Sequence, residues 1–281
     1  MDMTENIGTE SGAWLGLEGR VCVITGAGSG IGAETARQFA AAGALVAILD
    51  LDGDSAAAVA AEIEHSGGRA IGLQADIGQP ESVAAAAAKV QAELGPCRIL
   101  VNNAAARHRD ALLDISLAAW NRVLGVNLTG ALICTQAFAP QMIAGGYGGS
   151  IVHVSSIIGH HPQSNSGAYG VSKAGLAMLS KLLTVELGQH GIRSNVVSPG
   201  FTRTPANEAA YRDPETAAAR QRMIPIGRVA TPTDLAHVIV FLASDRASYI
   251  DGQDIEVDGG VGRTLMNQVP RAHQAAWKVG Q

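Results

Sequence analysis

The stretch Val21-Cys22-Val23-Ile24-Thr25-Gly26-Ala27-Gly28-Ser29-Gly30-Ile31-Gly32 decides the fold. An apolar run with the length of a buried strand leads directly into glycines and then into the start of a helix. Glycine lets the backbone turn tightly and approach a ligand closely, and a helix N-terminus presents unpaired N–H groups to a phosphate. The stretch therefore predicts a strand, a turn and a helix that hold the pyrophosphate of a dinucleotide.

Two registers of the glycines fit this turn. Gly28-x-Gly30-x-x-Ala33 matches the usual dinucleotide pattern with alanine last, whereas Gly26-x-x-x-Gly30-x-Gly32 begins directly at the strand end. The second register fits the strand boundary better, and a purely structural turn is the alternative to both. The cofactor contacts expected from the turn are Gly26, Ser29, Gly30, Ile31 and Gly32.

Beyond the turn, short runs rich in Val, Ile and Leu alternate with longer alanine-rich amphipathic stretches. This alternation is typical of βαβ units. Strands are expected at 21–25, 45–50, 70–74, 99–102, 150–155, 193–197 and 254–257, and helices at 31–42, 55–65, 81–94, 117–144, 167–189 and 233–243. We therefore expect a single α/β domain, Rossmann-like and doubly wound, with a seven-stranded parallel sheet and helices on both faces.

The ends of the chain and one internal stretch fall outside this rhythm. Residues 1–18 are expected to form a flexible tail, 19–260 the dinucleotide-binding and catalytic domain, and 261–281 a C-terminal extension. This extension is expected to fold over the substrate or to reach a neighbouring subunit, with disorder as the alternative. Residues 201–229 contain three prolines between two strands, which predicts a mobile lid over the substrate, with an inconsequential surface loop as the alternative.

Composition excludes several classes of partner. The net charge of −5, the lack of a Lys/Arg cluster and the 4% aromatic content argue against nucleic acid. No secretory signal is expected, because residues 1–18 are acidic, and no membrane span, because charges, prolines and glycines interrupt every apolar run. Cys22, Cys97 and Cys134 are an odd number at wide spacings, which favours reduced thiols and a cytoplasmic location.

The residue that ends the second expected strand bears on the choice of dinucleotide. Asp50 follows Leu45-Val46-Ala47-Ile48-Leu49, where a carboxylate can accept hydrogen bonds from both hydroxyls of the adenosine ribose. The same carboxylate would repel a 2′-phosphate, and neither Ser29 nor Leu51 offers a compensating cation. We therefore predict NAD (NAD⁺/NADH) in preference to NADP, although Asp50 and Asp52 could also serve as turn formers.

Chemistry is indicated further along the chain by a tyrosine, a lysine and a serine. Tyr169 and Lys173 are four apart in an expected helix, so they share one face. A free phenol has a pKa of about 10, and a nearby ammonium stabilises the phenolate, so that one group can act as acid and as base. Ser156 follows the strand 150–155 and is expected at its carboxyl end, beside the glycine turn, where a hydroxyl can hold the reacting oxygen.

Together these residues resemble the short-chain dehydrogenase/reductase family, in its compact single-domain branch. The resemblance spans roughly 19–260 and includes Thr-Gly-x-x-x-Gly-x-Gly, Ser156 placed thirteen positions before Tyr169, and the turn Ser198-Pro199-Gly200. The family's Asn-Asn-Ala-Gly motif reads Asn102-Asn103-Ala104-Ala105 here, which adds a methyl group close to the cofactor.

The resemblance implies roles for individual residues. Tyr169 is the acid/base, Lys173 supports it and holds the nicotinamide ribose, Ser156 positions the substrate oxygen, and Asn127 anchors a proton-relay water, with a helix-bending asparagine as the alternative. Further cofactor contacts are expected from Leu51, Asp76, Ile77 (packing on the adenine), Asn103, Pro199, Gly200, Thr202 and Thr204. The closing segment 251–260 resembles the family strand that packs against a partner subunit, which implies a homotetramer or homodimer.

Two groups near the expected site remain to be interpreted. His160 and His161 adjoin Ser156, but a metal site is not expected, because no carboxylate or cysteine at ligand spacing joins them. His161 and Gln163 are expected to line the substrate pocket instead. Arg107 and Arg109 follow the asparagine pair, so they are either solvated loop charges or a sign of an acidic or phosphorylated substrate.

The sequence therefore predicts an enzyme, an NAD-dependent oxidoreductase that interconverts a secondary alcohol and a ketone by hydride transfer. Two alternatives are an NADPH-dependent reductase of carrier-bound 3-oxoacyl groups and a non-catalytic dinucleotide-binding regulator. The first conflicts with Asp50, and the second has no need for all of Ser156, Tyr169, Lys173 and Asn127. The pattern does not name the substrate.

Overall fold

The computed structural model describes residues 14–265 and contains the predicted seven-stranded parallel sheet. Strands β1 (Val21–Thr25), β2 (Leu45–Asp50) and β7 (Asp254–Val257) have the predicted bounds. The others differ by one or two residues at an end: β3 (Arg69–Gln74), β4 (Cys97–Asn102), β5 (Gly149–Val154) and β6 (Ile192–Pro199). The order β3-β2-β1-β4-β5-β6-β7 reverses direction between β1 and β4, which is where a doubly wound sheet binds its ligand.

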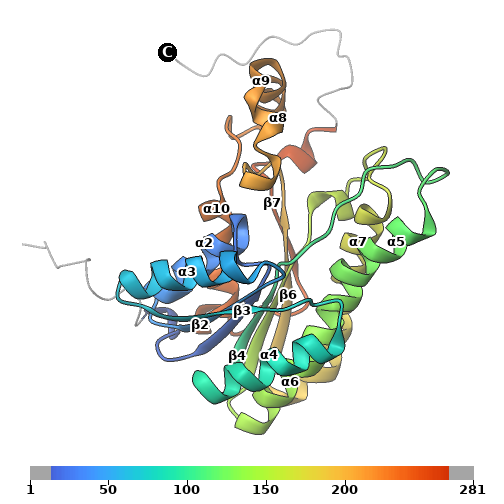
Figure 1. Ribbon diagram of the computed structural model, residues 1–281. Helices are drawn as coiled ribbons and strands as arrows, with labels where there is room; N and C mark the ends of the chain where they lie inside the picture. The colour runs from blue at the N-terminus through green and yellow to red at the C-terminus, as the bar shows by residue number, and fades with distance from the viewer. Residues whose placement is uncertain (1–13, 266–281) are drawn as a thin grey trace, which may run out of the picture.

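Helices cover both faces of the sheet, as predicted (Figure 1). One face carries α2 (Gly30–Ala41), α3 (Gly53–His65) and α10 (Pro232–Ala243), and a core of side chains such as Phe39, Ile63 and Ile239 fills the space beneath them. The other face carries α4 (Pro80–Glu93), α6 (Gly130–Gly145) and α7 (Ala168–Leu187). The central strands β1 and β5 are buried on both faces, which explains why β1 is almost entirely apolar.

The long helix predicted at 117–144 is interrupted. The structure divides it into α5 (Leu117–Leu124), a π-helical turn at Gly125–Thr129, and α6. This helical stretch, 117–145, has a mean hydropathy of 1.3 in its most apolar window and would be long enough to cross a membrane. Its apolar side chains, Phe138 and Met142 among them, pack against the sheet, so core packing explains the composition.

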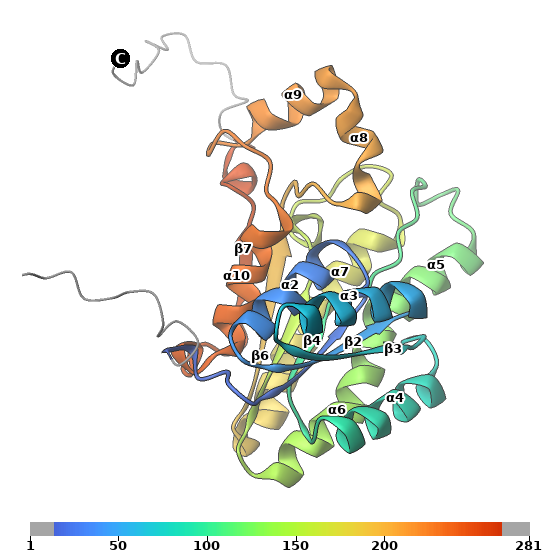
Figure 2. The ribbon, with the colours of Figure 1, turned by 60° about the vertical axis from the view of Figure 1, so that its left-hand side comes forward.

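The segment between β6 and α10 contains two short helices that the sequence did not indicate, α8 (Ala209–Arg212) and α9 (Pro214–Met223). They project beyond the carboxyl ends of the strands, in the position predicted for a lid (Figures 1 and 2). None of the side chains of α9 is buried, and Tyr211 of α8 is 9% exposed. The segment is therefore folded, and its mobility stays a prediction.

One local expectation was wrong. Residues 14–18 are not a loose tail, because Leu17 is fully buried and the carbonyl of Trp14 accepts a 2.5 Å hydrogen bond from Arg246 Nε. Asp52 caps α3, since its side chain accepts from the backbone N–H groups of Asp54 and Ser55. The predicted tail up to residue 13 and the C-terminal extension from residue 266 lie outside the described residues.

Candidate active site

The glycine turn has the conformation that the second register requires. Gly26 and Gly30 have positive φ angles of 63° and 58°, which side chains other than glycine rarely adopt. A Cβ on Gly32 would lie 2.4 Å from the carbonyl oxygen of Gly26, so no other residue fits there. Ser29, at the start of α2, makes no side-chain cap, which leaves the first N–H groups of the helix free to bind a pyrophosphate.

Asn103 braces this turn from the neighbouring strand. Its side-chain amide donates to the carbonyls of Thr25 (3.0 Å) and Gly26 (2.9 Å), and its backbone N–H donates to the Thr25 hydroxyl (3.1 Å). Ala104 donates to the same hydroxyl at 3.1 Å, and its Cα would lie only 2.6 Å from a Cβ on Gly26. These hydrogen bonds make Asn103 a positioning residue of the turn. Thr25 was not predicted, and its signal was a hydroxyl at the end of an otherwise apolar strand.

Asp50 ends β2 beside the glycine turn. Its carboxylate accepts hydrogen bonds from the backbone N–H groups of Gly28 (2.8 Å) and Asp52 (3.1 Å). These bonds fix the orientation of the carboxylate and close the end of the turn against β2. Leu51, the next residue, is 67% exposed and adds no charge. The turn therefore carries a fixed negative charge where the adenosine ribose of a dinucleotide is expected.

The adenine end of the expected site follows β3. Asp76 Oδ1 accepts a 2.9 Å hydrogen bond from Gly78 N, so its carboxylate is oriented by its own turn. Ile77 differs from expectation, because its side chain is 6% exposed and lies 2.8 Å from the position of a Cβ on Gly130. The side chain is thus taken up by the core, and a contact with an adenine would have to come from its backbone.

The turn after β6 reaches back over the glycines. Thr204 is the neighbour nearest to Gly30, where a Cβ on the glycine would lie 3.7 Å from it. Thr202 is 6% exposed and forms a bridge with Ala230. Gly200, which follows Pro199, passes so close to β7 that a Cβ would lie 2.6 Å from Asp258 Cα. This turn therefore joins β6, β7 and the phosphate end of the expected site.

Tyr169 and Lys173 lie together at the carboxyl end of β5, the strand that Ser156 follows. The ammonium of Lys173 is 2% exposed, donates to the carbonyl of Val154 (2.7 Å) and lies 5.7 Å from the centroid of the Tyr169 ring. The Ser155 hydroxyl donates to the Lys173 carbonyl at 2.8 Å, which holds α7 against β5. Burial, and secondarily the charge of Arg107, lower the pKa of Lys173 to about 7.

Asn127 lies in the π-helical turn, a feature that is often found at functional sites. Its side chain accepts from the backbone N–H of Ala106 (2.7 Å) and donates to the carbonyl of the same residue (3.0 Å) and to the hydroxyl of Ser172 (2.9 Å). Asn127 therefore ties the loop after β4 to α7, the helix that carries Tyr169 and Lys173. Neither Ala106 nor Ser172 was predicted, because no local pattern reveals them.

The histidines after Ser156 do have carboxylate neighbours, so the statement that none joins them was wrong. His160 Nε2 lies 2.7 Å from Asp254 and His161 Nε2 lies 2.7 Å from Glu256, both on β7. Each pair holds one histidine and one carboxylate, and no group of three or more metal-ligating side chains occurs within residues 14–265. The contacts of His161 point to β7, while the side chain of Gln163 is exposed and makes no hydrogen bond within the same residues.

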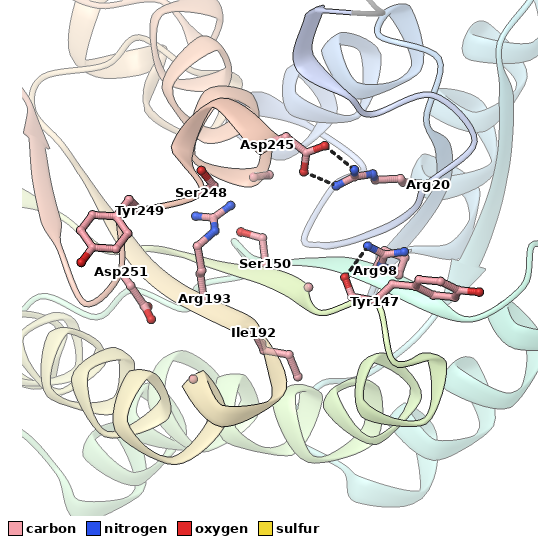
Figure 3. Close-up of a pocket in the computed structure, with 14 residues that line it drawn as sticks. Arg20, Arg98, Tyr147, Ser150, Ile192, Arg193, Asp245, Ser248, Tyr249 and Asp251 are labelled. Atoms are coloured by element: carbon pink, nitrogen blue, oxygen red, sulfur yellow. Dashed lines mark hydrogen bonds and ion pairs between the residues drawn. The ribbon is translucent and has the colours of Figure 1, made fainter.

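A separate cavity of about 450 Å³ lies at the end of the sheet opposite to the carboxyl ends of the strands (Figure 3). It is lined by residues at the amino ends of the strands, among them Arg20, Arg98 and Arg193. Arg20 pairs with Asp245 at 2.6 Å, and burial followed by the charge of Arg20 lowers the pKa of Arg98. None of the residues predicted for the site lines this cavity.

Known proteins are similar to this one over most of its chain. The family model described as enoyl-(acyl carrier protein) reductase matches residues 26–262. A cis-4-hydroxycyclohexanecarboxylate dehydrogenase from Sinomonas cyclohexanicum is 43% identical over 243 residues, which cover 86% of this chain and 96% of that protein. Among solved structures, a short-chain type dehydrogenase/reductase from Mycobacterium marinum has a TM-score of 0.83 at 37% identity, covering 89% of this chain and 99% of its own.

A second solved structure adds information on ligands. A gluconate 5-dehydrogenase from Burkholderia cenocepacia, in complex with NADP and tartrate, has a TM-score of 0.83 at 32% identity. The match covers 88% of this chain and 96% of that one.

Proposed function

The chain belongs to the short-chain dehydrogenase/reductase family and is an oxidoreductase that acts on CH–OH groups; we propose that it interconverts a secondary alcohol and a ketone with NAD. The observation that carries the proposal is the closeness of the Lys173 ammonium to the Tyr169 ring at the carboxyl end of β5, the strand that Ser156 follows, on the side of the sheet that holds the glycine turn. A bound nicotinamide dinucleotide supplies the hydride acceptor for alcohol oxidation and the donor for ketone reduction.

In this proposal Tyr169 removes the hydroxyl proton of the alcohol, or returns it to the ketone oxygen. The nearby Lys173 ammonium stabilises the tyrosinate electrostatically, and Ser156 holds the reacting oxygen by a hydrogen bond. Through its hydrogen bond to Ser172, Asn127 fixes α7, the helix that carries Tyr169 and Lys173. We propose that Asn127 also holds a water of the proton relay. Because the pKa of Lys173 is about 7, this group can exchange a proton with such a relay near neutral pH.

The cofactor preference is part of the proposal. The carboxylate of Asp50 is held at the ribose end of the glycine turn, and Leu51 beside it supplies no cation for a 2′-phosphate. The Burkholderia gluconate 5-dehydrogenase is in complex with NADP, which supports NADP as the competing cofactor. The competing function is an NADPH-dependent reductase of carrier-bound 3-oxoacyl groups. A non-catalytic regulator is a further alternative, and it would bind dinucleotide without turnover.

One assay separates these candidates. The enzyme is tested for reduction of NAD⁺ and NADP⁺ with cis-4-hydroxycyclohexanecarboxylate, polyols, hydroxy acids and hydroxysteroids, and for oxidation of NADH and NADPH with 3-oxoacyl thioesters. We expect turnover of a secondary alcohol with NAD⁺. Turnover of 3-oxoacyl thioesters alone with NADPH would support the acyl reductase, and binding of dinucleotide with no turnover of any compound would support the regulator.

We also propose that the protein is a homotetramer or homodimer. The outer side of α7 exposes Val171 (48%), Met178 (57%), Leu182 (53%) and Val185 (81%), and Leu132 and Ile143 of α6 are each 37% exposed. Apolar side chains that gather on neighbouring helices are typical of a subunit interface. Analytical ultracentrifugation tests this directly. Leu182→Glu should shift the protein to smaller species, and a monomeric wild-type protein would contradict the proposal.

A further inference from the structure

Arg107 lies directly over the ring of the proposed acid/base. Its Cζ is 5.2 Å from the centroid of the Tyr169 ring. The loop that carries it, between β4 and α5, reaches the start of α7, since a Cβ on Gly167 would lie 3.4 Å from the carbonyl oxygen of Asp110. This loop lies on the same side of the molecule as α8 and α9 (Figures 1 and 2). Arg107 is thus a side chain of the reaction centre rather than of a remote surface.

Within residues 14–265, Arg107 has no anionic partner, unlike the five arginines that form ion pairs. The guanidinium groups of Arg20, Arg37, Arg203, Arg228 and Arg263 all pair with carboxylates. Arg107 makes no ion pair and no hydrogen bond through its side chain within residues 14–265. The nearest acidic residue along its own loop, Asp110, is taken by His108 at 2.6 Å. The positive charge of Arg107 is therefore left for a group from outside the described chain.

The charge at the reaction centre is also unbalanced. Lys173 Nζ lies 5.7 Å from the same tyrosine ring and is buried, so two cations face one aromatic group. The charge of Arg107 adds to the burial of Lys173 in lowering the pKa of that lysine. An anion beside Arg107 would relieve this repulsion. The local electrostatics therefore favour a substrate with a negative group.

The backbone that carries Arg107 is fixed. Asn127 makes two reciprocal hydrogen bonds with Ala106, the residue immediately before Arg107, at 2.7 and 3.0 Å. A side chain whose backbone is held in place loses less conformational freedom on binding than one on a free loop. Arg109, two residues further on, is exposed as Arg107 is but has no such support of its backbone, so it offers a matched comparison on the same loop.

We propose that Arg107 binds a carboxylate of the substrate, so that the enzyme acts on hydroxy acids, meaning secondary alcohols that carry a carboxylate. A guanidinium presents a planar pair of donors that matches a carboxylate, and one guanidinium balances one negative charge. This inference rests on the proposed function, because it assumes that the alcohol binds at Tyr169.

Binding to the NAD⁺-loaded enzyme tests the inference without requiring turnover. Isothermal titration calorimetry compares cyclohexanecarboxylate with the isosteric but neutral cyclohexanecarboxamide and with cyclohexyl phosphate. Because charge-assisted hydrogen bonds are the stronger kind, we expect the carboxylate to bind the wild-type enzyme about 10- to 100-fold more tightly than the amide. Arg107→Gln should abolish this preference, Arg107→Lys should retain part of it, and Arg109→Gln should leave it intact.

Several results would overturn the inference. These are equal affinity for acid and amide, no detectable binding of either, tighter binding of the phosphate, or a preference lost equally in Arg109→Gln. Turnover assays distinguish a failure of the Arg107 inference from a failure of the proposed function. Oxidation of neutral alcohols without any carboxylate preference would leave the proposed function standing and reject Arg107. A carboxylate preference that depends on Arg107, with no alcohol oxidised, would support carboxylate binding by Arg107 and reject the proposed function.

Discussion

The prediction that depends most directly on a single charge concerns Asp50 and the choice between NAD and NADP. The 2′-phosphate of NADP would lie where the ribose hydroxyl of NAD meets the Asp50 carboxylate. Two unit charges about 4 Å apart repel by roughly 1 kcal/mol in water and about 4 kcal/mol at an effective dielectric constant of 20. Asp50 is half-buried, so we take the intermediate range of about 1–3 kcal/mol. The wild-type enzyme should then prefer NAD⁺ by about 5- to 150-fold in kcat/KM.

Asp50→Asn removes the charge and keeps the shape of the side chain. We expect kcat/KM for NAD⁺ to fall about tenfold, because charged hydrogen bonds to the ribose are replaced by weaker ones, while that for NADP⁺ stays level or rises. Steady-state kinetics with both dinucleotides measures the ratio. Asp52→Asn is the matched control, since Asp52 caps α3 and should affect stability alone. A wild-type enzyme that uses NADP⁺ as well as NAD⁺, or an unchanged ratio in Asp50→Asn, would refute the reasoning.

Three further predictions concern the turn, the loop after β4 and a buried histidine. Gly32→Ala places a methyl group 2.4 Å from the Gly26 carbonyl and should weaken NAD⁺ binding more than about tenfold by calorimetry, whereas Gly188→Ala, which meets open space, should not. Asn127→Ala leaves both backbone groups of Ala106 without a partner and should lower the free energy of unfolding by about 1–3 kcal/mol in urea, together with kcat. Burial, and secondarily Lys173, lower the pKa of His153 to about 3 in the folded protein, so the unfolded chain takes up a proton first as the pH falls. Stability should therefore be complete above about pH 6.5 and be lost by up to about 1.4 kcal/mol per pH unit toward pH 3. Urea unfolding of His153→Gln should show a shallower loss, and an equal slope in both proteins would contradict this.

The strands and the glycine turn could be predicted because their signals are local. Strands β1 and β2, for example, are apolar runs that are largely buried, and they lead into Gly26 and end at Asp50, respectively. The side chains of Tyr169 and Lys173 share a helix face by spacing alone. Asp50 was placed correctly beside the turn because the end of β2 lies next to the end of β1 in a parallel sheet.

The features that escaped prediction depend on contacts between distant segments. Asp254 and Glu256 lie more than 90 residues after the histidines that they contact, and only the pairing of β6 with β7 brings them together. The π-helical turn at Asn127 follows from its bonds to Ala106 and Ser172, which helical periodicity does not contain. Helices α8 and α9 were missed because α9 has no buried face to produce an apolar repeat.

The central claim is that Tyr169 is the acid/base of alcohol oxidation. The most direct test is the rate of NADH formation by Tyr169→Phe with a secondary alcohol that the wild-type enzyme oxidises, alongside the dissociation constant for NAD⁺. General acid–base catalysis contributes about 10²- to 10⁴-fold, so kcat should fall by at least a hundredfold while NAD⁺ binding stays nearly the same. Wild-type turnover in Tyr169→Phe, with its dinucleotide binding intact, would contradict the account.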